Sequence, residues 1–168
     1  MSNLPYHEKT DRDNILHLRQ LLQELPKFCS QYFRGIEPRT SSRTRIAYAY
    51  DLKIFFEFLL NEHLNFHQNT IKEIQLEELD ELHVSDIEEY MEYLKYRFNE
   101  KNQEIINKER GIMRKISSLK SFYNYYFRLE KLKTNPPALV QMQKIHDKEI
   151  IRLDIDEVAM LLDEVEQG

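Results

Sequence analysis

The amino-acid sequence predicts an all-α protein. Only three of its 168 residues are glycine and none is tryptophan, while charged and apolar residues are intermixed along the whole chain. Such a composition favours helices over short strands joined by glycine-rich turns. The length suits one domain with a hydrophobic core and additional segments at its ends.

The first part of the chain predicts two short helices. Residues before about Asp11 are expected to be disordered. In the range Asp13–Leu25, apolar residues recur every three or four positions, and Pro26 should stop or kink the helix that they form. A second helix is predicted over Pro26–Arg34, with Gly35 as its terminator.

A longer helix should follow a linker at residues 37–40. Ser41 or Ser42 is the candidate N-cap, and the helix can run to about Glu62. Its broad apolar stripe, which should be buried, consists of Ile46, Tyr48, Ala49, Leu52, Phe55, Phe56 and Leu59. Residues 64–82 have short apolar stretches without a sustained period, which predicts a loop with one helical turn.

Two further helices complete the predicted bundle. Ser85 and Glu88 have capping-box spacing, so a helix should begin there and end near Asn99. After a polar loop, a long helix is predicted over residues 108–132, and the sequence Asn-Pro-Pro at 135–137 should end it.

The end of the chain has a different character. Residues 138–152 look extended and slightly basic, and Asp154 would cap a last amphipathic helix that reaches Gly168 with no evident packing partner. This pattern suggests the start of another domain.

The charges are unevenly distributed. The formal net charge is −5, which alone argues against a nucleic-acid partner. However, residues 73–92 contain nine acidic residues, whereas residues 108–133 contain eight basic residues and two acidic ones. Because nucleic-acid binding depends on local charge, the basic segment is the better guide to function.

The histidine, glycine, cysteine and tyrosine residues do not indicate a catalytic or cofactor-binding site. Of the six histidines, His63 and His67 are four residues apart, but no predicted helix carries both and no cysteine pair accompanies them, so a metal site is not indicated. Three glycines cannot build a phosphate-binding loop. The single Cys29 excludes an internal disulfide framework and is expected to be a core residue, and most tyrosines fit packing positions. We therefore predict no catalytic residues, no metal and no cofactor. Without a signal peptide or membrane span, the expected location is the cytoplasm.

Two groups of residues are candidate contacts with a polyanion. Basic and hydroxyl side chains can bind phosphates, and the first turn of a helix attracts anions. The first group, in the long helix, consists of Arg110, Arg114, Ser117, Ser118, Lys120 and Ser121. The second group, at the start of the helix that follows the linker, consists of Ser42, Arg43, Thr44 and Arg45. An ordinary solvated helix surface would carry the same pattern.

Two motifs occur in the order and spacing of a known family. RT-x3-Y-x2-DL-x2-F-x2-FL begins at Arg43, and RKISSLKSFY-x-Y begins at Arg114, with Asn135-Pro136 further on. Together they resemble the N-terminal core-binding domain of tyrosine recombinases of the Xer and phage-integrase type. The resemblance covers about Ser41 to Asp163.

This resemblance implies a SAM-like orthogonal bundle of four to five helices. Residues 1–40 would be an N-terminal helical extension, residues 41–137 the core-binding domain, and residues 138–168 the interdomain linker and the first helix of a catalytic domain. In the family, the core-binding domain forms one half of a C-shaped clamp around double-stranded DNA, next to other recombinase protomers. The catalytic residues, including the tyrosine nucleophile, belong to the later domain.

The resemblance also implies roles for single residues. Arg43, Thr44 and Tyr48 would lie on the helix that approaches DNA first, and the hydroxyl and basic residues from Arg114 to Ser121 on a helix that reaches the major groove. The chain should bind DNA without cutting it, whereas the parent protein would cleave and rejoin strands through a phosphotyrosine intermediate. The acidic segment should face away from DNA or toward a neighbouring protomer.

Two alternatives remain open at this point. A helical protein-interaction module would use the acidic face to bind its partner. A transcription regulator with a helix-turn-helix would need a short turn before its recognition helix, and the long spacer between Ser85 and Lys108 argues against it.

Overall fold

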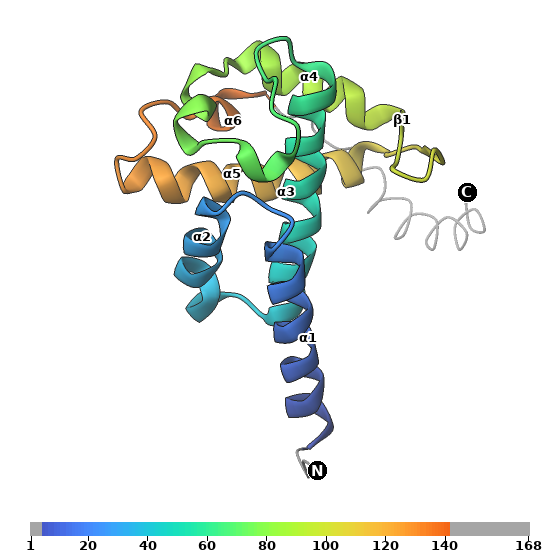
Figure 1. The fold of residues 1–168 in the computed structure, drawn as a ribbon, viewed down its shortest axis with the longest axis vertical. Coiled ribbons are helices and arrows are strands. Elements are labelled where there is room, and N and C mark those ends of the chain that lie inside the picture. Colours follow the sequence, from blue (N-terminus) through green and yellow to red (C-terminus); the bar gives the residue numbers. More distant parts are fainter. Residues whose placement is uncertain (1–4, 142–168) are drawn as a thin grey trace, which may run out of the picture.

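The computed structural model describes residues 5–141, and helices dominate this range (Figure 1). The all-α class is therefore confirmed. The elements are α1 (Tyr6–Leu22), α2 (Phe28–Ile36), the 3-10 helix η1 (Glu37–Arg39), α3 (Ser42–Glu62), the 3-10 helices η2 (Ile71–Glu73) and η3 (Leu76–Glu81), α4 (Val84–Lys95), β1 (Arg97–Phe98), β2 (Glu104–Ile105), α5 (Glu109–Arg128) and α6 (Pro136–Leu139). The predicted helix from Asp154 lies outside the described residues.

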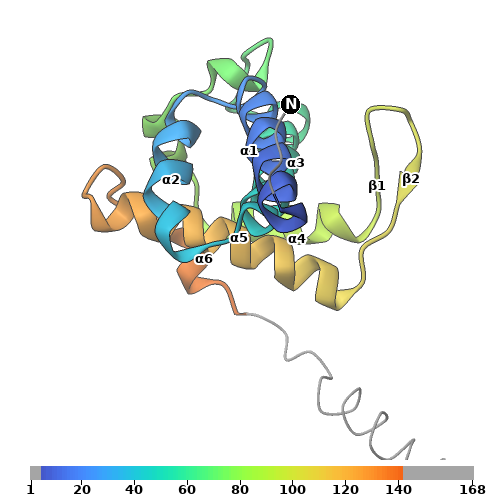
Figure 2. The ribbon, with the colours of Figure 1, turned by 90° about the horizontal axis from the view of Figure 1, so that it is seen from below.

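The helices form a bundle around one hydrophobic core. α1 lies alongside α3, and α5 crosses the direction of α3 (Figure 1), while the β1–β2 hairpin projects from the side of the bundle (Figure 2). Aromatic rings fill the centre: Phe122 on α5 contacts Phe28, Tyr32 and Phe56, with ring centroids 5.2 to 6.2 Å apart. The contacts with Tyr32 and Phe56 are edge-to-face, and such contacts stabilise a core beyond the burial of apolar area.

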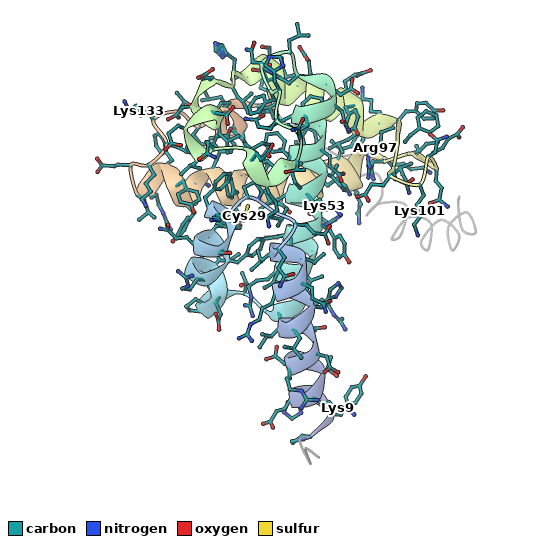
Figure 3. The ribbon with its side chains drawn as sticks, viewed as in Figure 1. Lys9, Cys29, Lys53, Arg97, Lys101 and Lys133 are labelled. Atoms are coloured by element: carbon teal, nitrogen blue, oxygen red, sulfur yellow. The ribbon has the colours of Figure 1, made fainter. Side chains whose placement is uncertain are left out.

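Cys29 lies within this core, as the sequence predicted (Figure 3). Its side chain is fully buried, and burial raises the pKa of the thiol. The thiol therefore stays protonated, which suits a packing residue and not a nucleophile.

Helix α1 begins earlier than predicted, so the expected disorder before Asp11 is wrong for residues 6–10. The carboxylate of Glu8 in its first turn interacts favourably with the positive end of the helix dipole and so stabilises the start of the helix. The apolar period starts only further along because the first turns do not pack on the core: Tyr6 is 84% exposed, whereas Leu18 and Leu21 are buried.

The prediction that Gly35 ends α2 is wrong, because the helix continues to Ile36. A Cβ atom at this position would lie 2.6 Å from Cζ of Tyr125, closer than any real contact of that kind. Glycine here lets the ring of Tyr125 lie close to the backbone of α2, and a larger residue would force that ring to move.

Helix α3 agrees with its prediction at both ends. The Oγ atom of Ser41 accepts a hydrogen bond from the backbone N–H of Thr44 at 3.1 Å, so Ser41 is the N-cap. The following loop carries two 3-10 helices where one helical turn was expected.

Helix α4 starts one residue before the predicted Ser85. Its capping box joins His83 and Asp86, whose carboxylate accepts from the backbone N–H of His83 at 2.7 Å. α4 ends at Lys95, and an antiparallel hairpin, which the sequence did not predict, connects it to α5. This hairpin replaces the short turn that a helix-turn-helix would need.

The hairpin turn depends on two asparagines. Asn102 has a φ of 60°, a left-handed conformation that asparagine tolerates. The side-chain oxygen of Asn99 accepts hydrogen bonds from the backbone N–H groups of Lys101 and Gln103, both at 2.9 Å. Each strand has only two residues, which is too short to show the alternation of apolar and polar residues that predicts a strand.

Helix α5 ends at Arg128, before the predicted prolines. The N–H of Glu130 donates to the carbonyl oxygen of Phe127, and the N–H of Lys131 donates to that of Tyr126, each at 3.0 Å. With Glu130 at a φ of 59°, this is a Schellman motif. The prolines at 136 and 137 instead begin α6.

Candidate nucleic-acid interface

Helix α5 separates a packed face from a polar one. Its buried face carries Ile112, Ile116, Leu119, Phe122, Tyr123 and Tyr126. Among its exposed or partly exposed residues, six recur at steps of three and four, and they are Arg110, Arg114, Ser117, Ser121, Asn124 and Arg128. We call these six residues the polar stripe. It runs the length of the helix and contains three cations and no carboxylate.

The C-terminal half of the polar stripe borders a surface hollow of about 460 Å³ between α5 and η1. The lining residues are Arg39, Ser117, Lys120, Ser121, Asn124, Tyr125 and Arg128. We call this the basic hollow, because three of these residues are cations and none is acidic. Ser121 is held in place by Tyr32, whose hydroxyl lies 2.7 Å from its Oγ atom.

Arg114 lies on the polar stripe but is anchored from below by Asp51 on α3. Its Nη1 donates to Oδ2 of Asp51 at 2.7 Å and its Nη2 donates to Oδ1 at 3.0 Å. Ser118 donates to the same Oδ2 at 2.7 Å, and Nζ of Lys115 lies 3.9 Å from Oδ1. Two cations thus surround one carboxylate.

This cluster is buried except for Arg114. The side chain of Arg114 is 51% exposed, compared with 3% for Asp51 and 8% for Lys115. Burial raises the pKa of the Asp51 carboxyl, and the hydrogen bond from Ser118 and the charge of Arg114 oppose this shift. Burial likewise lowers the pKa of the Lys115 ammonium, against the attraction of Asp51.

At the start of α3, two of the predicted contact residues have internal partners. Arg45 is buried, and its Nη1 donates to the carbonyl oxygens of Thr40 at 2.7 Å and Glu37 at 3.2 Å. Ser42 is also buried, and its Oγ accepts from the side chain of Asn14 at 3.2 Å. Arg45 thus ties the start of α3 to the preceding turn, and Ser42 ties it to α1.

The other residues near this end of α3 are more accessible. Arg43 is exposed in the first turn, Thr44 is partly exposed and accepts a hydrogen bond from Ser41 at 3.0 Å, and Tyr48 is partly buried against the core. Arg43 is thus the cation that this helix start presents to solvent.

The structure therefore divides the eleven predicted contact residues. It brings Ser117, Lys120 and Ser121 together in the basic hollow and places Arg110 and Arg114 nearer the N-terminal end of the same helix. It gives Arg45, Ser42 and Ser118 internal hydrogen bonds. Ser118 is fully buried. A direct contact with DNA stays a prediction for each of the eleven.

Three residues of this surface were missing from the predicted contacts. Asn124 belongs to the polar face that the spacing already predicts, but it was not counted as a contact, and Arg128 continues the same spacing by one more step. Arg39 comes from η1, and only the tertiary structure brings it beside α5.

The acidic residues that the sequence singled out lie elsewhere. Glu81, Asp86 and Glu89 line a separate hollow of about 360 Å³ together with Glu62, and none of them lines the basic hollow. Which way this acidic surface faces relative to DNA stays a prediction.

Two further observations concern residues 5–141. Within this range, no three histidine, cysteine or acidic side chains come together as metal ligands. None of the helices in the described part of the chain combines the length and the apolar character needed to cross a membrane.

Comparison with known proteins agrees with the resemblance seen in the sequence. Residues 24–145 match the phage integrase SAM-like domain. The chain is 29% identical over 142 residues to tyrosine recombinase XerC of Caldanaerobacter subterraneus subsp. tengcongensis, covering 80% of this chain and 38% of the relative. XerC of Leptospira interrogans serovar copenhageni is 30% identical over 142 residues, which cover 84% and 39%. No solved structure matches significantly.

These matches confirm the predicted SAM-like, Xer-related character of the chain. The chain spans about two fifths of the length of the relatives that it matches. The domain boundaries predicted at residues 40 and 137 stay predictions.

Proposed function

Because the chain belongs to the family of phage integrase SAM-like domains, we propose that it is the DNA-binding, core-binding domain of a site-specific tyrosine recombinase. It forms one half of a clamp around duplex DNA at a recombination site, next to other recombinase protomers. The whole protein cleaves and rejoins strands through a phosphotyrosine intermediate. The chain described here binds DNA and supplies none of the catalytic residues.

The observation that carries this proposal is the continuity between the polar stripe and the basic hollow. Phosphate groups bind best to cations and to short hydroxyl or amide donors, which let the DNA backbone approach closely. The basic hollow offers Arg39, Lys120 and Arg128 as cations, and Ser117, Ser121 and Asn124 as short polar groups. A surface of this composition and without carboxylates suits a polyanion.

The test is fluorescence anisotropy of a labelled duplex of about 30 base pairs, titrated with the chain at several salt concentrations. If the six cations Arg39, Arg43, Arg110, Arg114, Lys120 and Arg128 each neutralise a phosphate, the logarithm of affinity falls with that of salt at a slope of about −5. The variant Lys120→Glu/Arg128→Glu should bind at least about tenfold more weakly, with the slope smaller in magnitude by about 2.

The matched control is Lys9→Glu/Lys72→Glu, which changes the net charge by the same amount. Lys9 lies near the far end of α1, away from α5 (Figure 3), and Lys72 lies on η2. The control should bind almost as the unchanged chain does. Equal losses in both variants would mean that binding follows net charge and not this surface, and absence of salt-dependent binding would refute the proposal.

A protein-interaction module is the second candidate, and one observation favours it. A groove of about 310 Å³ between α4 and α5 has Met91, Ile112 and Met113 among its lining residues, with Glu88 and Glu92 beside them. Methionine-rich apolar surfaces often bind protein partners. Stable self-association in sedimentation experiments, without salt-dependent DNA binding, would favour this candidate.

A further inference from the structure

The contact between Arg114 and Asp51 is unusual for a surface arginine. A carboxylate that is 3% exposed holds both terminal nitrogens of a side chain that is 51% exposed. We propose that Asp51 is a positioning residue, which fixes the Arg114 guanidinium in the orientation that receives a DNA phosphate. This inference rests on the proposed function and names the group that sets the geometry of its binding surface.

The geometry of the pair leaves Arg114 able to bind a second anion. A guanidinium has five N–H donors in a planar fork, and Asp51 receives one from each terminal nitrogen. The edge made by Nε and the neighbouring Nη carries two further donors, which match the spacing of two phosphate oxygens. Because the side chain is already held, it loses little conformational freedom when a phosphate binds.

Asp51 is itself held in place. Ser118 donates to Oδ2 at 2.7 Å and also lies 3.3 Å from the carbonyl oxygen of Arg114, one helical turn earlier. Ser118 is completely buried, so its role in this proposal is to orient the carboxylate of Asp51 and not to contact DNA.

The local charge also favours positioning. Lys115 lies 3.9 Å from the carboxylate, so the cluster of Arg114, Lys115 and Asp51 carries a net charge of about +1 when all three are ionised. Asp51 thus orients Arg114 without making this part of α5 negative.

The rival explanation is that Asp51 masks Arg114 and competes with DNA for it. The two explanations predict opposite signs for Asp51→Asn. Removing a carboxylate near a polyanion should strengthen binding if masking were correct. If Asp51 positions Arg114, the same change should weaken binding although the net charge has become more favourable.

The experiment measures DNA affinity by anisotropy for the whole chain and for Asp51→Asn, Arg114→Lys and the double variant. Each single variant should bind about five- to tenfold more weakly, the amount expected for a charge-assisted hydrogen bond. Arg114→Lys keeps the charge but loses the planar fork. The double variant should be no weaker than either single variant, since both remove the same arrangement.

Two readouts separate positioning from loss of structure. The salt slope of Asp51→Asn should be smaller in magnitude than that of the unchanged chain by no more than about 1, because only the Arg114 contact with phosphate is affected, and its circular dichroism should stay helical. Glu89→Gln, which removes an exposed carboxylate outside the basic hollow, is the charge control and should bind equally well or slightly more tightly. If Asp51→Asn does not fold, Ser118→Ala and Arg114→Lys provide the test, and each should weaken binding.

The outcomes distinguish the two proposals. No salt-dependent binding by the unchanged chain would refute the proposed function. Normal binding by the unchanged chain, with Asp51→Asn or Arg114→Lys binding as tightly or more tightly, would overturn the positioning role alone. Additive losses in the double variant would overturn it as well.

Discussion

At the scale of single residues, Gly35 and Tyr125 depend on each other. The ring of Tyr125 occupies the space that a side chain at position 35 would need, and its hydroxyl lies 3.4 Å from the carbonyl oxygen of Gln31. Tyr125 also lines the basic hollow. The smallest residue of α2 therefore supports the shape of the candidate DNA-binding surface.

Gly35→Ala should destabilise the protein, although alanine favours helices. The added Cβ forces the ring of Tyr125 to move, and overpacking of this kind costs about 1–3 kcal/mol. Urea denaturation measures the change in the free energy of unfolding.

The matched control is Gly111→Ala in the first turn of α5. There the nearest atom to a new Cβ is the side-chain nitrogen of Asn107, at 3.2 Å, which can move aside. This variant should be more stable by about 0.5–1 kcal/mol, the ordinary helix-propensity gain. Equal effects of the two substitutions would show that Tyr125 does not restrict position 35.

A carboxyl pair gives the stability a dependence on pH. Burial and the neighbouring Glu100 raise the pKa of Glu57 from 4.5 to about 7, while Lys53 and Arg97 oppose this shift. Because the folded state holds this proton more tightly than the unfolded chain, the contribution of Glu57 is largest below pH 4.5 and is lost as the pH rises to about 7. The pKa of Glu100 is lowered, so its own contribution is lost at more acidic pH.

Glu57→Gln should therefore reduce the loss of stability between pH 4.5 and about 7, the window between the ordinary and the raised pKa of Glu57. The measurement is urea denaturation at several pH values in this range. Glu77→Gln, which replaces an exposed carboxylate on η3, should keep the dependence of the unchanged chain. An unchanged pH profile in Glu57→Gln would contradict the assignment.

At the scale of elements, the C-terminus of α5 has a residue that is poorly suited to its conformation. Glu130 occupies the left-handed position of the Schellman motif, where glycine is the usual residue. Glu130→Gly should stabilise the protein by up to about 1 kcal/mol, because glycine removes the steric cost of a Cβ in this conformation. Thermal unfolding measures the gain.

Glu130→Ala is the control for the loss of charge. Alanine keeps the Cβ atom, so it should give little or none of the gain. A similar gain from alanine would mean that the charge of Glu130 near the helix end, and not its backbone conformation, is unfavourable.

A comparison of the predicted elements with the observed ones shows which kinds of element can be predicted from this sequence. Helices α3 and α5 were predicted because long apolar periods mark their buried faces, and Ser41 is a clear cap. The end of α5 was misplaced because a non-glycine residue adopts the left-handed conformation at Glu130, and propensity favours glycine there. The hairpin was missed because its strands are too short to show a period.

At the scale of the whole molecule, the candidate site was predicted in part for a physical reason. Spacing along one helix places residues on a face, so Ser117 and Ser121 were found together on α5. Spacing cannot show which residue at the edge of that face points into the bundle. Ser118 was therefore grouped with Ser117 and Ser121, although it is buried and donates a hydrogen bond to Asp51. Spacing along α5 also cannot reveal that Arg39, on η1, lies beside this helix.

The central position of α5 has a consequence for how the protein is made. Phe122 and Tyr126 on α5 contact Phe28 on α2, and the hydroxyl of Tyr126 donates to the carbonyl oxygen of Phe28, 98 residues earlier. While the ribosome is still synthesising the chain, α2 and α3 therefore expose the aromatic faces that α5 will cover. Contacts of such long range form late. Until α5 has emerged, these aromatic faces stay accessible to other chains.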